Sequence, residues 1–297
     1  MLTRDRPRKL AHVSDLHIGR SVESDARAMR LCQALVDARV DHVVVTGDVT
    51  HRGRQRELAR FHETFAPLRD SGRLTVIPGN HDRLGDDLGE TIMAGERVQA
   101  SVAPGLFLVR INSTGPHNRS WLTGHGRLDA EDLDAVEGIL GLAPPRPLVV
   151  ALMHHHPLPL PEDRAVERLS SWMGWRFTTE LERGHELLGR VRGRCDLVLH
   201  GHRHVPAERR PFADPRPLRV FNAGSSTELG RACIFTHVGG TLVTEPVWLD
   251  ALSQRRPEDR RHDRHDRQDR HDRQDRVDEQ AREQRQDRDY VRQQLAL

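Results

Sequence analysis

The segment VIPGNHDR, residues 76–83, joins a strand-like run to three polar side chains that a hydrophobic core does not need. It begins with β-prone residues, and its Pro-Gly pair is typical of a turn. Asn80, His81 and Asp82 then follow without a gap. An amide, an imidazole and a carboxylate are costly to bury unless they find partners. Their position at the end of a strand therefore indicates a functional site.

Short β-rich runs alternate with amphipathic helical stretches along the chain, which predicts an α/β fold with a central sheet and flanking helices. We predict strands at 9–15, 41–48, 73–80, 106–113, 146–154, 195–202 and 218–225 and helices at 23–40, 53–72, 129–141 and 178–193. The β-only ending at 232–249 contains Gly239-Gly240, which suits a tight hairpin turn. This ending indicates either a mixed sheet or two sheets that face each other.

Polar residues also follow four other predicted strands, and ligands of open α/β sheets bind at the carboxyl ends of strands. The candidate metal ligands are Asp15, His17, Asp48, Asn80, His154, His202 and His204. Residues two apart in an extended chain point to the same side, so Asp15 and His17 are expected to face together, as are His202 and His204. This set is too large for one tetrahedral ion and suits two divalent ions that share a carboxylate. The mixture of nitrogen and oxygen donors leaves Mn, Fe, Zn, Ni and Mg open.

In order, the chain contains DLH, GD, GNHD, HHH and GHRH. This order resembles the calcineurin-like metallophosphoesterase superfamily, and HHHPLP resembles its small bacterial branch, which includes cyclic-nucleotide phosphodiesterases. The resemblance covers about residues 10–250. It implies a four-layer αββα sandwich with two facing mixed β-sheets and a binuclear metal site at the carboxyl ends of strands.

The resemblance also implies a role for each matching residue. Asp48 would bridge two metals, and His81 would be the catalytic acid or a donor to the phosphoryl oxygens. The first metal would be held by Asp15, His17, Asp48 and His204. The second would be held by Asp48, Asn80, His154 and His202, while Asp82 would fix the turn.

One departure is visible in GDVTHRG, where His51 replaces the second Asp that the protein phosphatases of the superfamily carry. This change argues against a protein phosphatase. His51 is expected to contact substrate or to orient His81. Arg20 directly follows a ligand pair and is predicted to bind substrate, and His155 is a third candidate for such a contact. Trp172 and Trp175 either cover the core or form an aromatic lid.

Composition changes sharply near Ser253. We therefore predict a catalytic domain at 1–253 and a low-complexity tail at 254–297, in which RHD and RQD repeat with a period of three. That period matches neither a strand nor an amphipathic helix, and no core can be buried. The tail is predicted to be disordered, with a solvated charged helix as the alternative.

The charge balance and the cysteines bear on the expected partners and on the cellular compartment. Lys+Arg at 46 against Asp+Glu at 44 gives a net charge of +2, which by itself predicts no polyanionic partner. The three cysteines are scattered, and no apolar run suits a signal peptide or a membrane span, so we predict a cytoplasmic protein. The expected partner is a small-molecule phosphoester, and nucleic acid is possible but not favoured.

The sequence thus predicts a phosphoesterase that hydrolyses P–O bonds with hydroxide activated by two metals. The resemblance favours a phosphodiesterase for small substrates similar to cyclic nucleotides. DLHIGR also resembles the opening motif of double-strand-break repair nucleases, so a DNA nuclease is one alternative. An inactive metal-binding scaffold is another.

Overall fold

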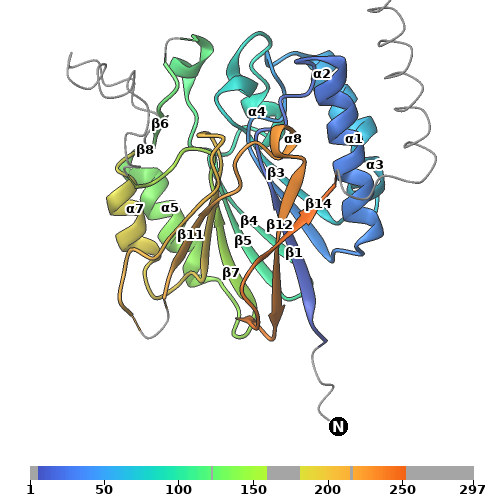
Figure 1. Ribbon diagram of the computed structural model, residues 1–297. Helices are drawn as coiled ribbons and strands as arrows, with labels where there is room; N and C mark the ends of the chain where they lie inside the picture. Colours follow the sequence, from blue (N-terminus) through green and yellow to red (C-terminus); the bar gives the residue numbers. More distant parts are fainter. Residues whose placement is uncertain (1–5, 122, 159–180, 215–216, 252–297) are drawn as a thin grey trace, which may run out of the picture. The chain divides into compact units, whose positions relative to one another are not determined.

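Two mixed β-sheets lie face to face between layers of helices (Figure 1). This is a computed structural model, and it describes residues 6–121, 123–158, 181–214 and 217–251. The first sheet has the order β13-β12-β1-β2-β3, with β14 also paired to β12. Its strands are β1 (Arg8–Val13), β2 (His42–Thr46), β3 (Leu74–Ile77), β12 (Arg231–Val238), β13 (Thr241–Leu242) and β14 (Val247–Asp250). β1, β2 and β3 are parallel, whereas β12 runs antiparallel to β1.

The second sheet has the order β10-β11-β9-β7-β5-β4. Its strands are β4 (Val98–Ala103), β5 (Leu106–Ile111), β7 (Leu148–Leu152), β9 (Leu197–His200), β10 (Ala207–Arg209) and β11 (Arg219–Asn222). The four central strands are parallel, and the two edge strands are antiparallel. β6 (Gly126–Arg127) and β8 (Leu181–Glu182) form a small separate pair.

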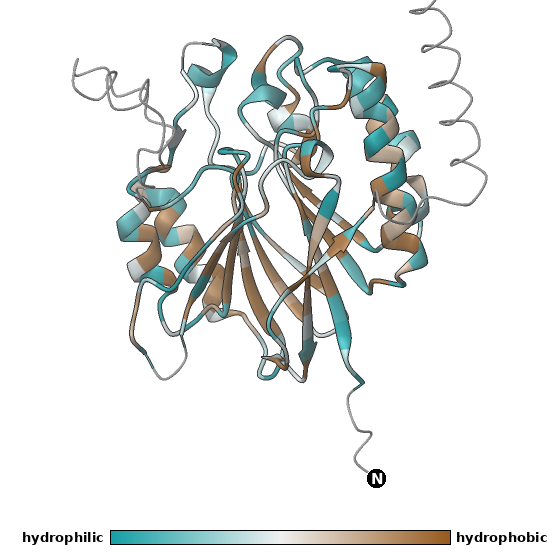
Figure 2. Ribbon diagram, in the orientation of Figure 1, coloured by the Kyte–Doolittle hydropathy of each residue, from teal (hydrophilic) through white to brown (hydrophobic). Residues whose placement is uncertain are grey.

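The apolar runs of the central strands are buried on both faces. Each sheet therefore packs against the other sheet on one face and against helices on the other. Val44 of β2 belongs to the core between the two sheets, whereas Val43 and Val45 pack with the helices on the outer face. Those helices are α1 (Val22–Asp37), α2 (Gln55–Thr64) and α3 (Ala66–Arg69). Val150 of β7 faces inward in the same way, and its neighbours pack with α5 (Ala130–Gly141) and α7 (Gly184–Val191). Figure 2 shows the resulting apolar strands between helices with polar outer faces. The predicted αββα sandwich is confirmed.

Some boundaries differ from the prediction. The helix expected at 53–72 is divided, because Pro67 has no N–H to donate and the chain turns at Phe65 between α2 and α3. Strand β4 was not predicted, since this edge strand is partly exposed and its pattern is weak. The hairpin at Gly239-Gly240 between β12 and β13 is confirmed.

Four short helices complete the description: η1 (His81–Arg83), α4 (Leu88–Ile92), η2 (Pro116–Arg119) and α8 (Ser226–Leu229). Trp172, Trp175 and the predicted tail at 254–297 lie outside the described residues. Among the helices of the described chain, none combines the length and the apolar character that crossing a bilayer requires.

Candidate metal centre

The predicted ligands come from loops that follow the carboxyl ends of β1, β2, β3, β7 and β9. In Figure 1 these ends lie at the top of the two sheets, near α4 and α8. Four of the candidate ligands are buried, with 0% of Asp15 and His154, 2% of Asp48 and 3% of His17 exposed, whereas Asn80, His202 and His204 are half-buried. The structure therefore brings together side chains that are up to 189 positions apart, from Asp15 to His204.

Five of these residues have a left-handed backbone, which is uncommon outside glycine. The φ angles are 52° at Asp15, 46° at His17, 47° at Asp48, 78° at His202 and 55° at His204. The expectation that each Asp/His or His/His pair faces one way because the chain is extended is thus wrong, since β1 ends at Val13 and β9 at His200. The pairs lie in turns beyond the strands instead.

Neighbouring segments hold these strained turns in place. The backbone N–H of Asp15 donates to Gly47 O at 3.1 Å, and that of His17 donates to Asp48 O at 2.9 Å. The N–H of His202 donates to the Asp15 carboxylate at 3.0 Å. A left-handed residue costs about 1–2 kcal/mol, so it persists where the surroundings determine it. Strain of this kind is typical of functional sites.

The first group of donor atoms is gathered around one side of Asp48. His17 Nε2 lies 3.0 Å from His204 Nε2 and 3.7 Å from Asp48 Oδ2. His204 Nε2 is also 3.4 Å from Asp15 Oδ1.

The second group faces the other carboxylate oxygen of Asp48. His154 Nε2 lies 3.0 Å from Asn80 Oδ1 and 3.4 Å from Asp48 Oδ1. His202 Nδ1 is 2.9 Å from the same Asn80 oxygen and 3.1 Å from His154 Nε2.

These separations suit metal coordination. Two donors about 2.1 Å from one cation, at right or tetrahedral angles, lie about 3.0 to 3.4 Å apart. Imidazole nitrogens and carboxylate oxygens make up both groups, the second group adds the amide oxygen of Asn80, and the described residues bring no thiolate to either. Asp48 directs one oxygen to each group, as a bridging carboxylate does. The donor set fits two divalent cations.

Burial favours the neutral imidazoles that can bind a cation. It lowers the pKa of His17 to about 4 and that of His202 well below its usual range. At His154 burial acts in the same direction, but the Asp48 and Asp15 carboxylates outweigh it and raise the pKa to about 9. A positive charge is therefore stabilised beside Asp48.

In two candidate ligands, the imidazole nitrogen that points away from the donor groups is held by a further group, which orients the ring. His154 Nδ1 donates to Thr46 O at 2.8 Å. His204 Nδ1 lies 3.4 Å from a carboxylate oxygen of Glu228 in α8, and Arg20 forms an ion pair with the same carboxylate. Glu228 was not predicted, although it lies just beyond the strand predicted at 218–225. Substrate binding by Arg20 stays a prediction, and its guanidinium already has this partner.

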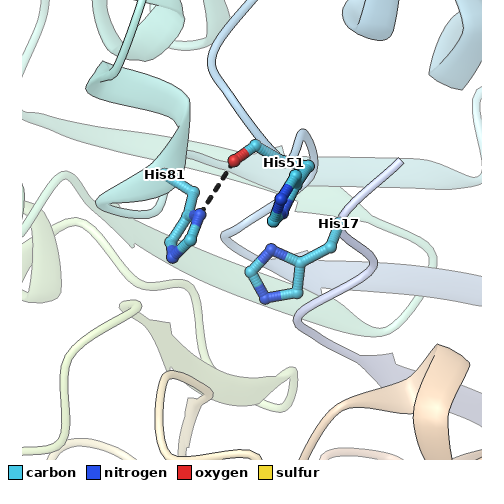
Figure 3. A group of neighbouring side chains, drawn as sticks. All are labelled: His17, His51 and His81. Carbon is cyan, nitrogen blue, oxygen red and sulfur yellow. Dashed lines mark hydrogen bonds between the residues drawn. The ribbon is translucent and has the colours of Figure 1, made fainter. Parts of the chain in front are cut away.

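His81 lies beside His17, a member of the first donor group (Figure 3). Its Nδ1 donates to the carbonyl oxygen of His51 at 2.9 Å, and its Nε2 is 4.0 Å from Asp48 Oδ2. Its ring centroid is 4.6 Å from that of His17. His51 therefore orients His81 through its backbone, while the two rings lie 5.7 Å apart.

Asp82 is completely buried and ties two ligand loops together. It accepts hydrogen bonds from Gly79 N at 2.8 Å, Thr50 N at 2.8 Å and Thr50 Oγ1 at 2.6 Å. The prediction that Asp82 fixes the turn is confirmed.

His155 is also completely buried, and its Nδ1 lies 2.9 Å from Ser113 Oγ. Its ring centroid is 4.8 Å from that of His202, so it packs beside a candidate ligand. Contact between His155 and substrate stays a prediction.

The calcineurin-like phosphoesterase family model matches residues 8–206, more than half of the chain. A probable cyclic nucleotide phosphodiesterase of Pseudoalteromonas sp. (strain SM9913) is 27% identical over 272 residues, covering 82% of this chain and 94% of that protein. The 3',5'-cyclic adenosine monophosphate phosphodiesterase CpdA of Vibrio vulnificus (strain CMCP6) is 27% identical over 163 residues, covering 50% of this chain and 56% of that one.

Two solved structures share the fold. A dimetal phosphatase from Danio rerio has a TM-score of 0.55 at 13% identity, covering 82% of this chain and 99% of that one. Purple acid phosphatase PPD1 from yellow lupin (Lupinus luteus) has a TM-score of 0.62 at 12% identity, covering 85% and 53%. The ordered motifs, the gathered donor groups and the family match lead to one conclusion: this chain belongs to the calcineurin-like phosphoesterase family.

Proposed function

We propose that the protein is a phosphodiesterase that uses two divalent cations to hydrolyse small phosphodiesters of the cyclic-nucleotide type. The observation that carries this proposal is the pair of donor groups that share Asp48, with one oxygen 3.7 Å from His17 Nε2 and the other 3.4 Å from His154 Nε2. One cation is assigned to Asp15, His17, Asp48 and His204. The other is assigned to Asp48, Asn80, His154 and His202.

When bound, two such cations supply positive charge for the phosphoryl oxygens and acidity for a water molecule. The chain supplies the rest. Asp48 holds the two donor groups together, and its Oδ1 accepts the backbone N–H of His81 at 2.8 Å. This bond places the His81 ring beside the shared carboxylate.

His81 is the proton donor in this proposal. A carbonyl oxygen only accepts, so the bond to His51 O requires a proton on His81 Nδ1. Nε2 is then the atom that gains or loses a proton, and it lies on the Asp48 side of the ring. From Nε2 a proton can pass to the leaving oxygen. General acid catalysis of this kind raises the reaction rate by about 10²–10⁴-fold.

The substrate class is supported by the relatives, because both matched curated proteins carry cyclic-nucleotide phosphodiesterase names. The candidate metals are Mn, Fe, Zn, Ni and Mg, since nitrogen and oxygen donors accept all of them.

The test combines elemental analysis of the purified full chain with hydrolysis of bis(p-nitrophenyl) phosphate in added Mn²⁺. We expect about two equivalents of metal and turnover that Asp48→Asn abolishes, whereas the exposed control Asp37→Asn retains it. Cyclic AMP and single-stranded DNA are then compared as substrates. Preference for DNA would indicate the nuclease, and lack of turnover with every divalent metal would indicate the scaffold.

A further inference from the structure

An exposed tryptophan stands beside the proposed proton donor. The Trp121 ring centroid lies 4.9 Å from that of His81, with the two planes at 90°, and 6.0 Å from that of His51. Trp121 is 61% exposed, so its indole contributes little to the core. It follows η2 in the loop that leads to β6, drawn in green above β6 in Figure 1.

The loop that carries Trp121 is held from within. Asn118 is completely buried, and its Oδ1 accepts the N–H of Gly115 at 2.9 Å. Its Nδ2 donates to Thr123 O at 2.8 Å and to His125 O at 3.0 Å. One amide thus closes the loop on both sides of Trp121.

The same loop is fastened to the turn that carries His81. Arg119 donates from Nε to Asp87 Oδ2 at 2.8 Å, and Arg83 donates from Nη1 to Asp87 Oδ1 at 2.6 Å. Arg83 is 3% exposed and ends η1, the helix that begins at His81. Asp87 therefore couples the position of the indole to that of the imidazole.

A large apolar ring held in solvent next to the reacting groups suits a flat ligand. Every nucleobase has a π face, and stacking on an aromatic side chain is tolerant of base identity. We propose that Trp121 forms the subsite for the aromatic part of the substrate, a nucleobase or an aryl group attached to the phosphate. This inference rests on the proposed function and narrows its substrate class to phosphodiesters that carry a flat ring.

Product binding tests the inference without turnover. Isothermal titration of the full chain in Mn²⁺ compares AMP with glycerol 3-phosphate, which has the phosphate but no ring. We expect Trp121→Leu to weaken AMP binding by about tenfold or more and to leave glycerol 3-phosphate unchanged, because leucine keeps apolar bulk but has no π face. Trp121→Phe should restore much of the affinity for AMP.

The matched control is Trp248→Leu, since Trp248 is 41% exposed on β14 and stacks with Arg231. It should bind both ligands as the wild type does. Double replacement of Trp172 and Trp175 by Leu asks whether those residues supply the aromatic contact instead.

Three results of the binding experiments would overturn the inference. Unchanged AMP binding in Trp121→Leu overturns the inference, as does an equal loss for the two ligands, which would assign Trp121 to support of His81. Loss of AMP binding in the Trp172/Trp175 variant with none in Trp121→Leu overturns it too. Failure of the wild type to hydrolyse bis(p-nitrophenyl) phosphate would reject the proposed function while leaving the binding comparison intact.

Discussion

His81 Nδ1 lies 2.9 Å from the carbonyl oxygen of His51, a residue 30 positions earlier in the chain. The bond joins the loop after β2 to the turn after β3, and it fixes which imidazole nitrogen faces the shared carboxylate. The His51 side chain takes no part in this bond. A backbone carbonyl remains when the His51 side chain is replaced. The position of His81 can therefore be kept while the His51 side chain is changed.

Replacing His81 by alanine should leave metal content unchanged and lower kcat by about 10²–10⁴-fold, because it removes a proton donor without removing a donor to metal. The deficit should be largest for substrates with poor leaving groups. Elemental analysis and kinetics on phosphodiesters of graded leaving-group pKa measure both effects. His51→Ala keeps the carbonyl that holds His81, so a loss of turnover in that variant would instead report a contact between the His51 side chain and substrate. Loss of metal from His81→Ala would show that His81 is a ligand.

Replacing Glu228 by alanine should weaken metal binding by about 10–100-fold, because the carboxylate beside His204 Nδ1 orients that ring. Metal titration by calorimetry measures the change. Glu23→Ala is the control: Glu23 lines the same surface pocket as Glu228 but pairs with Arg27. Equal affinities in Glu228→Ala and wild type would refute the role.

Replacing Arg20 by alanine distinguishes two roles for this residue, support of Glu228 and binding of substrate. If it acts only by holding Glu228, Arg20→Ala should reproduce a fraction of the metal-binding defect at unchanged KM. If it binds substrate, KM should rise while metal affinity stays constant. Measuring metal affinity and KM on the same preparation decides between the two.

Replacing Gly79 by alanine should displace the bridging carboxylate. An added Cβ would lie 2.2 Å from both Asp48 N and Asp48 Oδ1, which no rotamer can relieve. We expect loss of metal and of turnover. Gly189→Ala in α7 meets no atom within 4 Å and should preserve both. Full metal occupancy in Gly79→Ala, measured by elemental analysis, would contradict the assigned site.

The folded protein should become less stable as the pH falls, because His42 in β2 is buried in its neutral form. Its Nε2 bonds to Thr75 Oγ1 at 2.8 Å, and burial lowers the pKa from 6.5 to about 4. The unfolded state therefore binds more protons than the folded state between pH 6.5 and pH 4, and stability decreases as pH falls through that window. At pH 5 the loss is about 2 kcal/mol relative to pH 7.5.

Urea unfolding of wild type and His42→Gln at pH 7.5 and pH 5 tests this. The difference in unfolding free energy between the two proteins should shift by about 2 kcal/mol in favour of the variant at pH 5. The comparison cancels the contribution of the site histidines, which both proteins share. An identical pH dependence would rule out His42 as the source.

The predicted tail offers a last test. Deletion of 254–297 should leave kcat, KM and metal content unchanged, because the cut falls after β14 and all the assigned ligands precede it. Removal of residues 247–297, which also takes away β14 from its pairing with β12, should instead destabilise the first sheet. A large fall in kcat on deleting 254–297 alone would assign the tail to the active site.

The sequence alone determined the α/β class and the candidate ligands, because both depend on local patterns, and the resemblance carried by the ordered motifs implied the sandwich. Apolar strands such as 146–154 predict burial on two faces, and polar residues placed just after them predict a site at one edge. Only the tertiary structure decided which atoms meet. The left-handed turns at Asp15 and His202, the carbonyl that holds His81, the pairing of Arg20 with Glu228 and the place of Trp121 all depend on contacts between separate segments. Such contacts have no local signature, since they arise when the sheets pack and bring distant loops within bonding distance.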